Sequence, residues 1–143
     1  MSVVYTYLVM DILHIGHTRM LERARELAGE EGQLIAGILT DDAAMEKKPR
    51  PVLRFEVRAE IARAIKYIDR VVTQTTYLPF CNVEWIRPDI LIESSSHRDE
   101  DVKRAQRLMR QLGGRVVVVP YLEGISSSAL KEKIRASPRH NCS

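Results

Sequence analysis

The fold of this chain is decided by residues 2–39, SVVYTYLVMDILHIGHTRMLERARELAGEEGQLIAGIL. Residues 2–10 form an apolar run rich in Val and Tyr that is long enough for a buried strand. Apolar residues at helical spacing predict a helix over residues 18–28, which two nearby glycines end. Residues 34–39 predict a second buried strand. Strand, helix and strand in this order are typical of a parallel α/β unit.

The alternation of strand and helix continues through the rest of the chain. We predict further strands around residues 71–72, 90–92 and 116–119, further helices over 55–68, 101–112 and 126–134, and at most a short helix over 82–86. Residues 41–54 are polar and contain two prolines, so we expect them to be largely loop. Apolar strands between amphipathic helices predict an α/β fold with a parallel sheet covered on both faces. Ligands of such sheets bind beyond the carboxyl ends of the strands, where the strand order reverses.

The composition is that of an ordinary globular domain. Hydrophobic side chains make up 45% of the 143 residues and charged ones 29%, which excludes a disordered, collagen-like or disulfide-stapled chain. No uncharged apolar run approaches the ~18 residues that span a membrane, so we expect no membrane partner. We expect one domain over residues 1–137 and a disordered tail over residues 138–143.

The net charge and the cysteine content narrow the expected partners and the expected cellular compartment. The net charge of +3 fits either a solvated surface of mixed charge or a basic pocket for phosphates. No dense basic stripe is interleaved with aromatic residues, so nucleic acid is not an expected partner. Cys81 and Cys142 give neither a disulfide framework nor a metal-ligand spacing, and the N-terminus lacks a secretory signal pattern. We therefore expect a reducing, cytoplasmic setting.

Two histidines stand directly after the first predicted strand. The spacing of His14 and His17 places both rings on one side of a first helical turn, and Gly16 between them lets an anion approach the backbone. A helix N-terminus adds unpaired N–H groups and a positive dipole end. This combination favours a polyphosphate whose charge grows during a reaction. The alternatives are a structural histidine pair or a metal pair, although two ligands are too few for zinc.

A second anion site is predicted between the last strand and the last helix. Gly124 permits a tight turn, and the serines of residues 126–128 offer hydroxyl and N–H groups at another helix N-terminus. Serines cap many helices, so this pattern alone is weak. It gains weight because it follows a strand at the same sheet edge as the histidines.

Two further polar segments follow strands at that edge. Residues 47–50 (KKPR), with Arg54 and Arg58, form either a mobile basic lid or a solvated run of charge. Residues 93–97 (ESSSH) follow the fourth predicted strand, and their chemistry is ambiguous.

The motifs together resemble one family. Residues 11–17 (DILHIGH) are similar to the signature of the cytidylyltransferase family within the HxGH nucleotidyltransferase superfamily. Similar stretches follow in order over residues 3–135: they are 21–25 with 40–41, 55–60, 64–69 and the closing motif 124–128. Glycerol-3-phosphate cytidylyltransferases share the general layout, and phosphonate-pathway cytidylyltransferase domains share the stretch 120–128. The HxGH motif alone is not specific, but the joint pattern is.

The resemblance implies a fold and a reaction. The fold is a Rossmann-like sheet of five parallel strands in the order 3-2-1-4-5. The reaction transfers CMP from CTP to a small phosphate- or phosphonate-bearing acceptor and releases pyrophosphate. Mg²⁺ is the implied cofactor because it neutralises the triphosphate, and a homodimer is the implied assembly.

The resemblance also implies a set of site residues. The implied catalytic residues are His14, His17 and Lys48. Those that bind the nucleotide are Val9, Met10, Asp11, Gly16, Glu93, Gly124, Ile125, Ser126, Ser127 and Ser128. Those that bind the acceptor are Asp41, Arg50, Arg58 and Tyr121, and Asp11 is a candidate magnesium ligand through water.

Three departures from the family pattern leave alternatives open. Bulky residues 8–10 (LVM) replace a small-residue trio and could crowd the triphosphate, which favours a non-catalytic nucleotide-binding scaffold. Residues 94–97 replace a Gly-Asp-Asp-Trp segment near the base, which favours an adenylyltransferase that uses ATP. An arginine before the closing motif is replaced by Tyr121 or Leu122, so Arg50 or Arg54 would supply that phosphate contact. Class I aminoacyl-tRNA synthetases share a similar turn but are longer than this chain.

Overall fold

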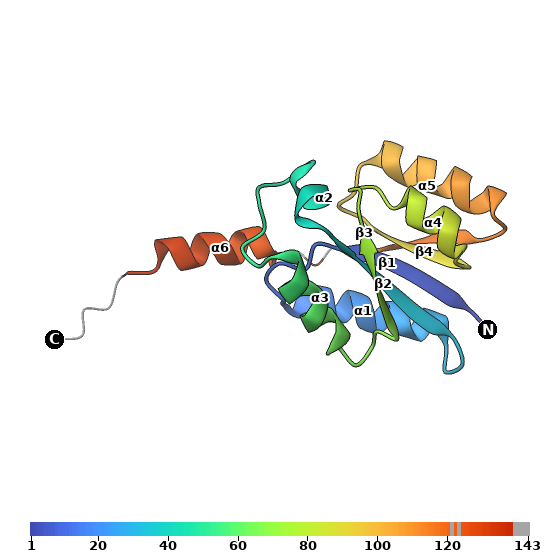
Figure 1. The fold of residues 1–143 in the computed structure, drawn as a ribbon, viewed down its shortest axis with the longest axis horizontal. Helices are drawn as coiled ribbons and strands as arrows, with labels where there is room; N and C mark the ends of the chain where they lie inside the picture. Colours follow the sequence, from blue (N-terminus) through green and yellow to red (C-terminus); the bar gives the residue numbers. More distant parts are fainter. Residues whose placement is uncertain (121, 123, 139–143) are drawn as a thin grey trace.

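A single parallel sheet forms the centre of the molecule. The structure is a computed structural model that describes residues 1–120, 122 and 124–138. Within these residues the strands are β1 (Val3–Leu8), β2 (Gln33–Leu39), β3 (Arg70–Gln74), β4 (Ile90–Ser94) and β5 (Arg115–Val119). They pair in parallel in the order β3-β2-β1-β4-β5, which confirms the Rossmann-like sheet (Figure 1). The strand order reverses between β1 and β4, so this is where a ligand is expected.

Helices cover both faces of the sheet. They are α1 (Ile15–Ala28), α2 (Asp41–Met45), α3 (Phe55–Arg63), α4 (Phe80–Ile86), α5 (Asp99–Gln111) and α6 (Ser127–Ala136). In Figure 1, α1 and α3 lie on one face of the sheet and α4 and α5 on the other, while α6 points away from the body.

The side chains of β1 alternate between two buried layers. Val4 and Leu8 pack in the layer under α1 and α3, together with Leu21 of α1. Tyr5, between them, packs in the opposite layer with Val83 of α4. A central strand buried on both faces is what a parallel sheet with helices on each side requires.

A buried polar network joins β1, β3 and α4 on the α4/α5 face. The hydroxyl of Tyr5 donates to Oε1 of Gln74 (2.6 Å) and accepts from Nδ2 of Asn82 (2.9 Å). A Cβ atom at Gly37 of β2 would lie 1.9 Å from this hydroxyl. The neighbouring strand therefore needs glycine at this position, and burial raises the pKa of the Tyr5 hydroxyl.

Two helix ends differ from the sequence prediction by three residues or more, and one short helix was not predicted. Helix α1 begins at Ile15, three residues before residue 18, because His14 supplies its N-cap. A short helix, α2, occupies part of the predicted loop, and the hydroxyl of Thr40 caps it by accepting from the amide of Ala43 (3.1 Å). Helix α3 ends at Arg63, although the apolar spacing continues to residue 68; Ile65 and Ile68 pack on the core from the turn that leads to β3.

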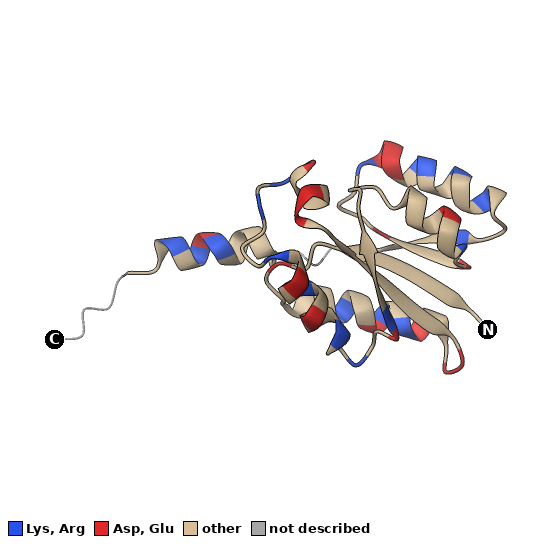
Figure 2. Ribbon diagram, viewed as in Figure 1, with Lys and Arg blue, Asp and Glu red and all other residues tan. Residues whose placement is uncertain are grey.

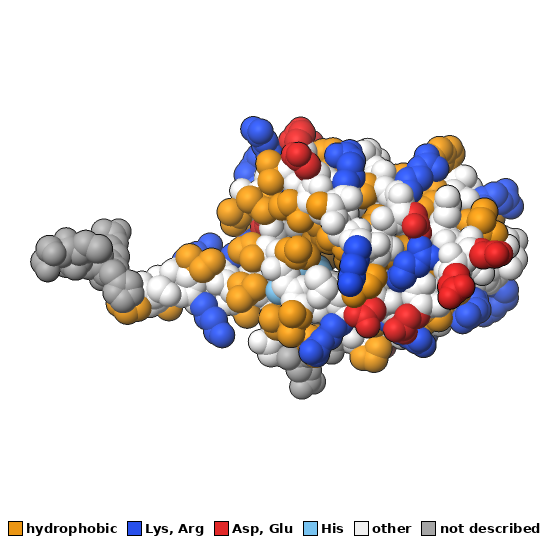
Figure 3. Space-filling view, turned by 90° about the horizontal axis from the view of Figure 1, so that it is seen from below, with side chains coloured by type: hydrophobic (Ala, Val, Ile, Leu, Met, Phe, Trp, Pro, Cys, Tyr) orange, Lys and Arg blue, Asp and Glu red, His pale blue; other side chains and the backbone are white. Residues whose placement is uncertain are grey.

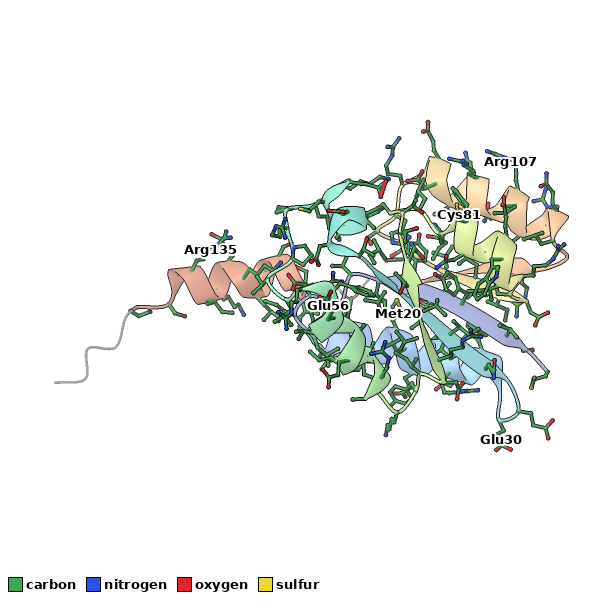
Figure 4. The ribbon with its side chains drawn as sticks, in the orientation of Figure 1. Met20, Glu30, Glu56, Cys81, Arg107 and Arg135 are labelled. Carbon is green, nitrogen blue, oxygen red and sulfur yellow. The ribbon has the colours of Figure 1, made fainter. Side chains whose placement is uncertain are left out.

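Helix α6 is the least integrated element. It buries none of its side chains, all of which the structure describes. Figure 4 labels Arg135 on α6, far from Arg107 on α5. Of the predicted tail, Pro138 is described and residues 139–143 lie outside the described part. Within the described part, no helix is both long and apolar enough to cross a membrane.

Candidate active site

The two histidines of the first turn of α1 are held by the backbone around them. Nδ1 of His14 accepts a hydrogen bond from the amide of Gly16 (3.0 Å), and Nδ1 of His17 accepts one from the amide of His14 (3.3 Å). The ring centroids lie 4.0 Å apart. Because each Nδ1 accepts, the ring proton of each neutral histidine is on Nε2. The turn therefore offers two N–H donors side by side.

Both imidazoles are neutral at pH 7. Burial, together with smaller effects of the His14 ring and the charge of Lys48, lowers the pKa of His17 from 6.5 to about 4. Burial also lowers the pKa of His14. Neutral donors in fixed positions stabilise negative charge that develops on a bound phosphate.

Gly16 is required by the histidine ring rather than only by a ligand. A Cβ atom there would lie 2.7 Å from Cε1 and 2.8 Å from Nδ1 of His14. The same Cβ would lie 3.6 Å from Cγ2 of Ile125, which comes from the second predicted anion site. The structure thus brings the two predicted turns together.

The serine turn is bonded directly to the chain before the histidines. The hydroxyl of Ser127 donates to the carbonyl oxygen of Ile12 (3.0 Å). Ser126 caps α6, since its Oγ accepts from the amide of Ala129 (3.0 Å). Gly124 has a φ of 79°, the left-handed conformation that glycine adopts without strain. Ser128 is exposed at the start of the helix.

Asp11 joins three segments of the chain. Its Oδ1 accepts from the amide of Leu53 and its Oδ2 from the amide of Val52, both at 2.8 Å. Its carboxylate also forms an ion pair with Lys131 of α6. Burial alone would raise the pKa of Asp11, but these three donors outweigh burial and the pKa lies below its ordinary value. Asp11 thus fastens the loop before α3 and helix α6 to the histidine turn.

Arg58, a predicted acceptor residue, lies inside the protein. It is 0% exposed, and its Nε donates to the carbonyl of Leu53 (2.8 Å). Nη1 donates to the carbonyls of Val9 (2.7 Å) and Leu39 (2.8 Å), and Nη2 pairs with Oδ1 of Asp41 (2.7 Å). Arg58 therefore holds the ends of β1 and β2 in place, and Asp41, the other predicted acceptor residue, is its partner.

The bulky residues before Asp11 do not gather between the histidine turn and the serine turn. Leu8 and Met10 are buried in the layer under α1, whereas Val9 is half-buried. Met10 has a φ of 56°, an uncommon left-handed conformation for a residue with a side chain. Figure 3 shows a small histidine surface between apolar side chains where α6 leaves the body, and the structure leaves both His14 and His17 half-buried.

The loop between α2 and α3 carries several Lys and Arg residues (Figure 2), and residues 46–50 of it are exposed. Lys48 lies close enough to His17 for its charge to lower the pKa of that imidazole. Arg50 and Arg54 are exposed on the same loop. Tyr121, the remaining predicted acceptor residue, lies outside the described residues.

Glu93, at the end of β4, is engaged by His97, which belongs to the polar segment 93–97, and by Tyr7, which sequence reasoning had not singled out. Only 1% of Glu93 is exposed, and the hydroxyl of Tyr7 donates to its carboxylate oxygens (2.8 and 3.0 Å). His97 pairs with the same carboxylate through Nδ1 and stacks on Tyr7 with a centroid distance of 5.6 Å. Burial and the charge of Glu93 raise the pKa of Tyr7. Side chains two residues apart in a strand lie on the same face, so Tyr7 shares the α4/α5 face with Tyr5. This spacing could have identified Tyr7 from the sequence.

The described residues do not build a metal cage. No group of three or more His, Cys, Asp or Glu side chains among them converges on one point. The carboxylate of Asp11 is already occupied by two amides and Lys131.

Two imidazole donors and a serine-capped helix meet at one edge of a doubly wound sheet. This fold and site define a nucleotidyltransferase domain of the HxGH class. The chain belongs to the cytidylyltransferase-like family, whose model matches residues 9–133.

Relatives from several organisms support this assignment. The bifunctional protein HldE of Magnetococcus marinus is 34% identical over 137 residues, which cover 94% of this chain and 27% of that protein. The FAD synthase of Korarchaeum cryptofilum is 33% identical over 126 residues, which cover 87% of this chain and 85% of the synthase. The chain thus spans about a quarter of the HldE protein it matches.

A solved structure shares the fold. The crystal structure of the lipopolysaccharide core biosynthesis protein from Thermoplasma volcanium superposes with a TM-score of 0.70 at 24% identity. The match covers 85% of this chain and 96% of that one. At this identity the similarity supports the α/β architecture alone.

Proposed function

We propose that this chain transfers CMP from CTP to a small acceptor that carries a phosphate or phosphonate, with release of pyrophosphate. The observation that carries the proposal is the pair of neutral Nε2–H donors of His14 and His17 beside the serine-capped start of α6. The resemblance of residues 120–128 to phosphonate-pathway cytidylyltransferase domains supports CTP as the nucleotide and a phosphorus oxyanion as the nucleophile.

The proposed reaction needs no covalent enzyme intermediate. An acceptor oxygen forms a bond to the α-phosphorus of CTP while the bond from that phosphorus to the β-bridging oxygen breaks. Pyrophosphate leaves with the electron pair of the broken bond. Because the acceptor oxyanion is already ionised, no proton has to be removed, and the protein contributes positioning and charge stabilisation.

Each group has a proposed task in that transfer. His14 and His17 donate hydrogen bonds to the reacting phosphates, and Lys48 adds positive charge from the loop. The amides at the start of α6, with Ser126 and Ser127, bind the rest of the triphosphate. Mg²⁺ enters with the nucleotide phosphates, and no step depends on an ion held by the protein. Asp11, Asp41 and Arg58 position these segments without touching the reacting atoms.

Transfer of AMP from ATP is the second candidate. A specific observation favours it, because a relative at 33% identity is named FAD synthase, and FAD contains adenine. The segment 94–97 also differs from the pattern that accompanies cytosine in the resembling family. The two candidates share one reaction and differ only in the base.

The test is pyrophosphate release with CTP or ATP, Mg²⁺ and a panel of phosphorylated and phosphonated acceptors. We expect turnover with CTP to exceed turnover with ATP, and His17→Ala to abolish most of it. Faster turnover with ATP would select the second candidate. Calorimetric binding of a nucleotide without pyrophosphate release from any acceptor would indicate a non-catalytic binding domain. Light scattering would test the proposed homodimer separately.

A further inference from the structure

The loop between α2 and α3, residues 46–54, makes a contact that joins the two halves of the sheet. The loop follows β2, whereas α5 follows β4, and β1 stands between these two strands. Figure 1 shows α2 and the first turn of α5 at the same edge of the sheet. Nζ of Lys47, in this loop, lies 3.3 Å from Oδ2 of Asp101, in that turn. The ion pair therefore links segments that lie on either side of β1.

A second contact fixes the neighbouring residue of the loop. The amide of Tyr77, which follows β3, donates to Oε2 of Glu46 (2.7 Å). The ring of Tyr77 also faces the ammonium group of Lys47, with 4.8 Å between Nζ and the ring centroid. An aromatic face and a carboxylate both stabilise an ammonium ion. Two consecutive loop residues are thus tied to segments outside the loop, and we call these contacts of Glu46 and Lys47 the strap.

The far end of the loop is fixed as well. The amides of Val52 and Leu53 donate to the buried carboxylate of Asp11. Between this anchor and the strap stand only residues 48–51, KPRP, and the φ angle of each of the two prolines is fixed by its ring. Lys48 is the first residue of this short segment. The strap therefore sets the position from which the side chain of Lys48 extends.

The direction of Lys48 follows from the helical turn after α2. The amides of Lys47 and Lys48 both donate to the carbonyl of Ala44 (3.3 and 3.0 Å), so the helical path of α2 continues through them. Successive side chains on such a path diverge by about 100°. When Lys47 points toward Asp101, Lys48 therefore points in another direction, and its charge acts on His17 of the histidine turn.

Resting on the proposed function, we propose that Glu46 and Lys47 are positioning residues, which direct the ammonium group of Lys48 to the phosphates that the histidine turn binds. Neither residue has to touch the substrate. Exposed ion pairs and cation–π contacts are individually weak, and the side chain of Lys47 is 36% exposed. The strap therefore shifts the population of loop positions rather than locking one of them, and it can open while substrate and product exchange.

Turnover tests the proposal with a conservative rescue. Lys47→Met and Asp101→Asn should each lower kcat about fivefold, because Lys48 spends less time at the phosphates. Lys47→Arg should retain most of the wild-type kcat, since a guanidinium keeps both the charge and the aromatic contact. The matched control Asp99→Asn, an exposed residue of the same helical turn, should leave kcat unchanged. In a Lys48→Met background, Lys47→Met and Asp101→Asn should have no further effect.

Titration of His17 by NMR tests the same point without turnover. Among the described residues, Lys48 carries a charge that lowers the pKa of this imidazole, whereas Lys47 is not among the groups that do so. Lys48→Met should therefore raise the pKa of His17, and Lys47→Met should raise it part of the way by releasing Lys48. The two substitutions together should raise it no further than Lys48→Met alone. Asp99→Asn should leave it unchanged.

The results that contradict the strap differ from those that contradict the transfer reaction. An unchanged pKa of His17 in Lys47→Met, equal kcat in the Asp101 and Asp99 variants, or a Lys47→Arg enzyme as slow as Lys47→Met would each overturn the proposal. A shifted titration of His17 without pyrophosphate release from any acceptor upholds the strap and rejects the proposed function. Pyrophosphate release with an unshifted titration does the reverse.

Discussion

The two helix N-termini of the site are held in different ways. Helix α1 buries Leu21, Ala24 and Ala28 against the sheet and begins with a reciprocal cap between His14 and His17. Helix α6 buries none of its described side chains. It is joined to the body at its start, through Ser127 on Ile12 and Lys131 on Asp11.

The site therefore has a fixed half, the histidine turn at the start of α1, and an adjustable half, the serine turn at the start of α6. Donors on a packed helix keep their positions before substrate binds, which is what transition-state stabilisation needs. A helix with few buried contacts has a low cost of local displacement. We therefore expect the histidine half to control turnover and the serine half to control nucleotide affinity.

The largest expected effect on stability comes from Arg58, which supports the fixed half by holding the ends of β1 and β2. Arg58→Met removes a buried charge and the hydrogen bonds that its guanidinium donates to the carbonyls of Val9, Leu39 and Leu53. We expect a loss of about 3–5 kcal/mol in the free energy of unfolding, measured by urea denaturation. The control Arg63→Met changes an exposed residue of the same helix and should cost far less. Equal losses would mean that Arg58 does not support the site.

The second largest expected effect is a loss of stability at acidic pH, through protonation of His17. The unfolded chain protonates His17 near pH 6.5 and the folded chain near pH 4, so the unfolded state binds more protons between these values. Stability should be fully present above pH 6.5 and fall by up to roughly 3 kcal/mol as the pH drops to 4. Melting curves of wild type and His17→Ala measure this, because the variant lacks the His17 contribution. Parallel losses in both proteins would contradict it.

Turnover gives the most direct comparison of the two halves. His17→Ala should lower kcat on the order of 10²-fold by removing one donor to the developing charge. The expected change in unfolding free energy at pH 7 is small, and Arg19→Ala, an exposed neighbour, serves as the control. Intact turnover with a large loss of stability would make His17 a structural residue.

The smallest expected effect belongs to the adjustable half. Lys131→Met removes the ion pair with Asp11, and we expect it to cost about 1 kcal/mol of stability while raising KM for the nucleotide more than it lowers kcat. Lys133→Met, an exposed lysine of the same helix, is the matched control. A fall in kcat with unchanged KM would show that α6 is as fixed as α1.

Much of the fold was predictable because it follows from local patterns. Apolar strands and helical spacing placed all five strands and most helices, and the alternation implied the parallel sheet. The predicted end of α3 at residue 68 was wrong, because Ile65 and Ile68 keep the helical spacing although they pack on the core from a turn. Such spacing reports which residues are buried and does not report the backbone conformation that buries them.

The candidate site was predictable only in part. The motifs placed His14, His17 and the serines at one edge, and their contact through Ile12 and Ile125 agrees with that expectation. The burial of Arg58 was not predictable, because three of its four acceptors lie 17 to 49 residues before it in the sequence.

The contact between Tyr5 and Gly37 has an evolutionary consequence. The tyrosine hydroxyl fills the space that any side chain on the adjacent strand would need. A larger residue at position 37 is therefore compatible only with a shorter one at position 5, and that change removes the hydroxyl that Gln74 and Asn82 bind. In an alignment of relatives, we expect these positions to covary as a set.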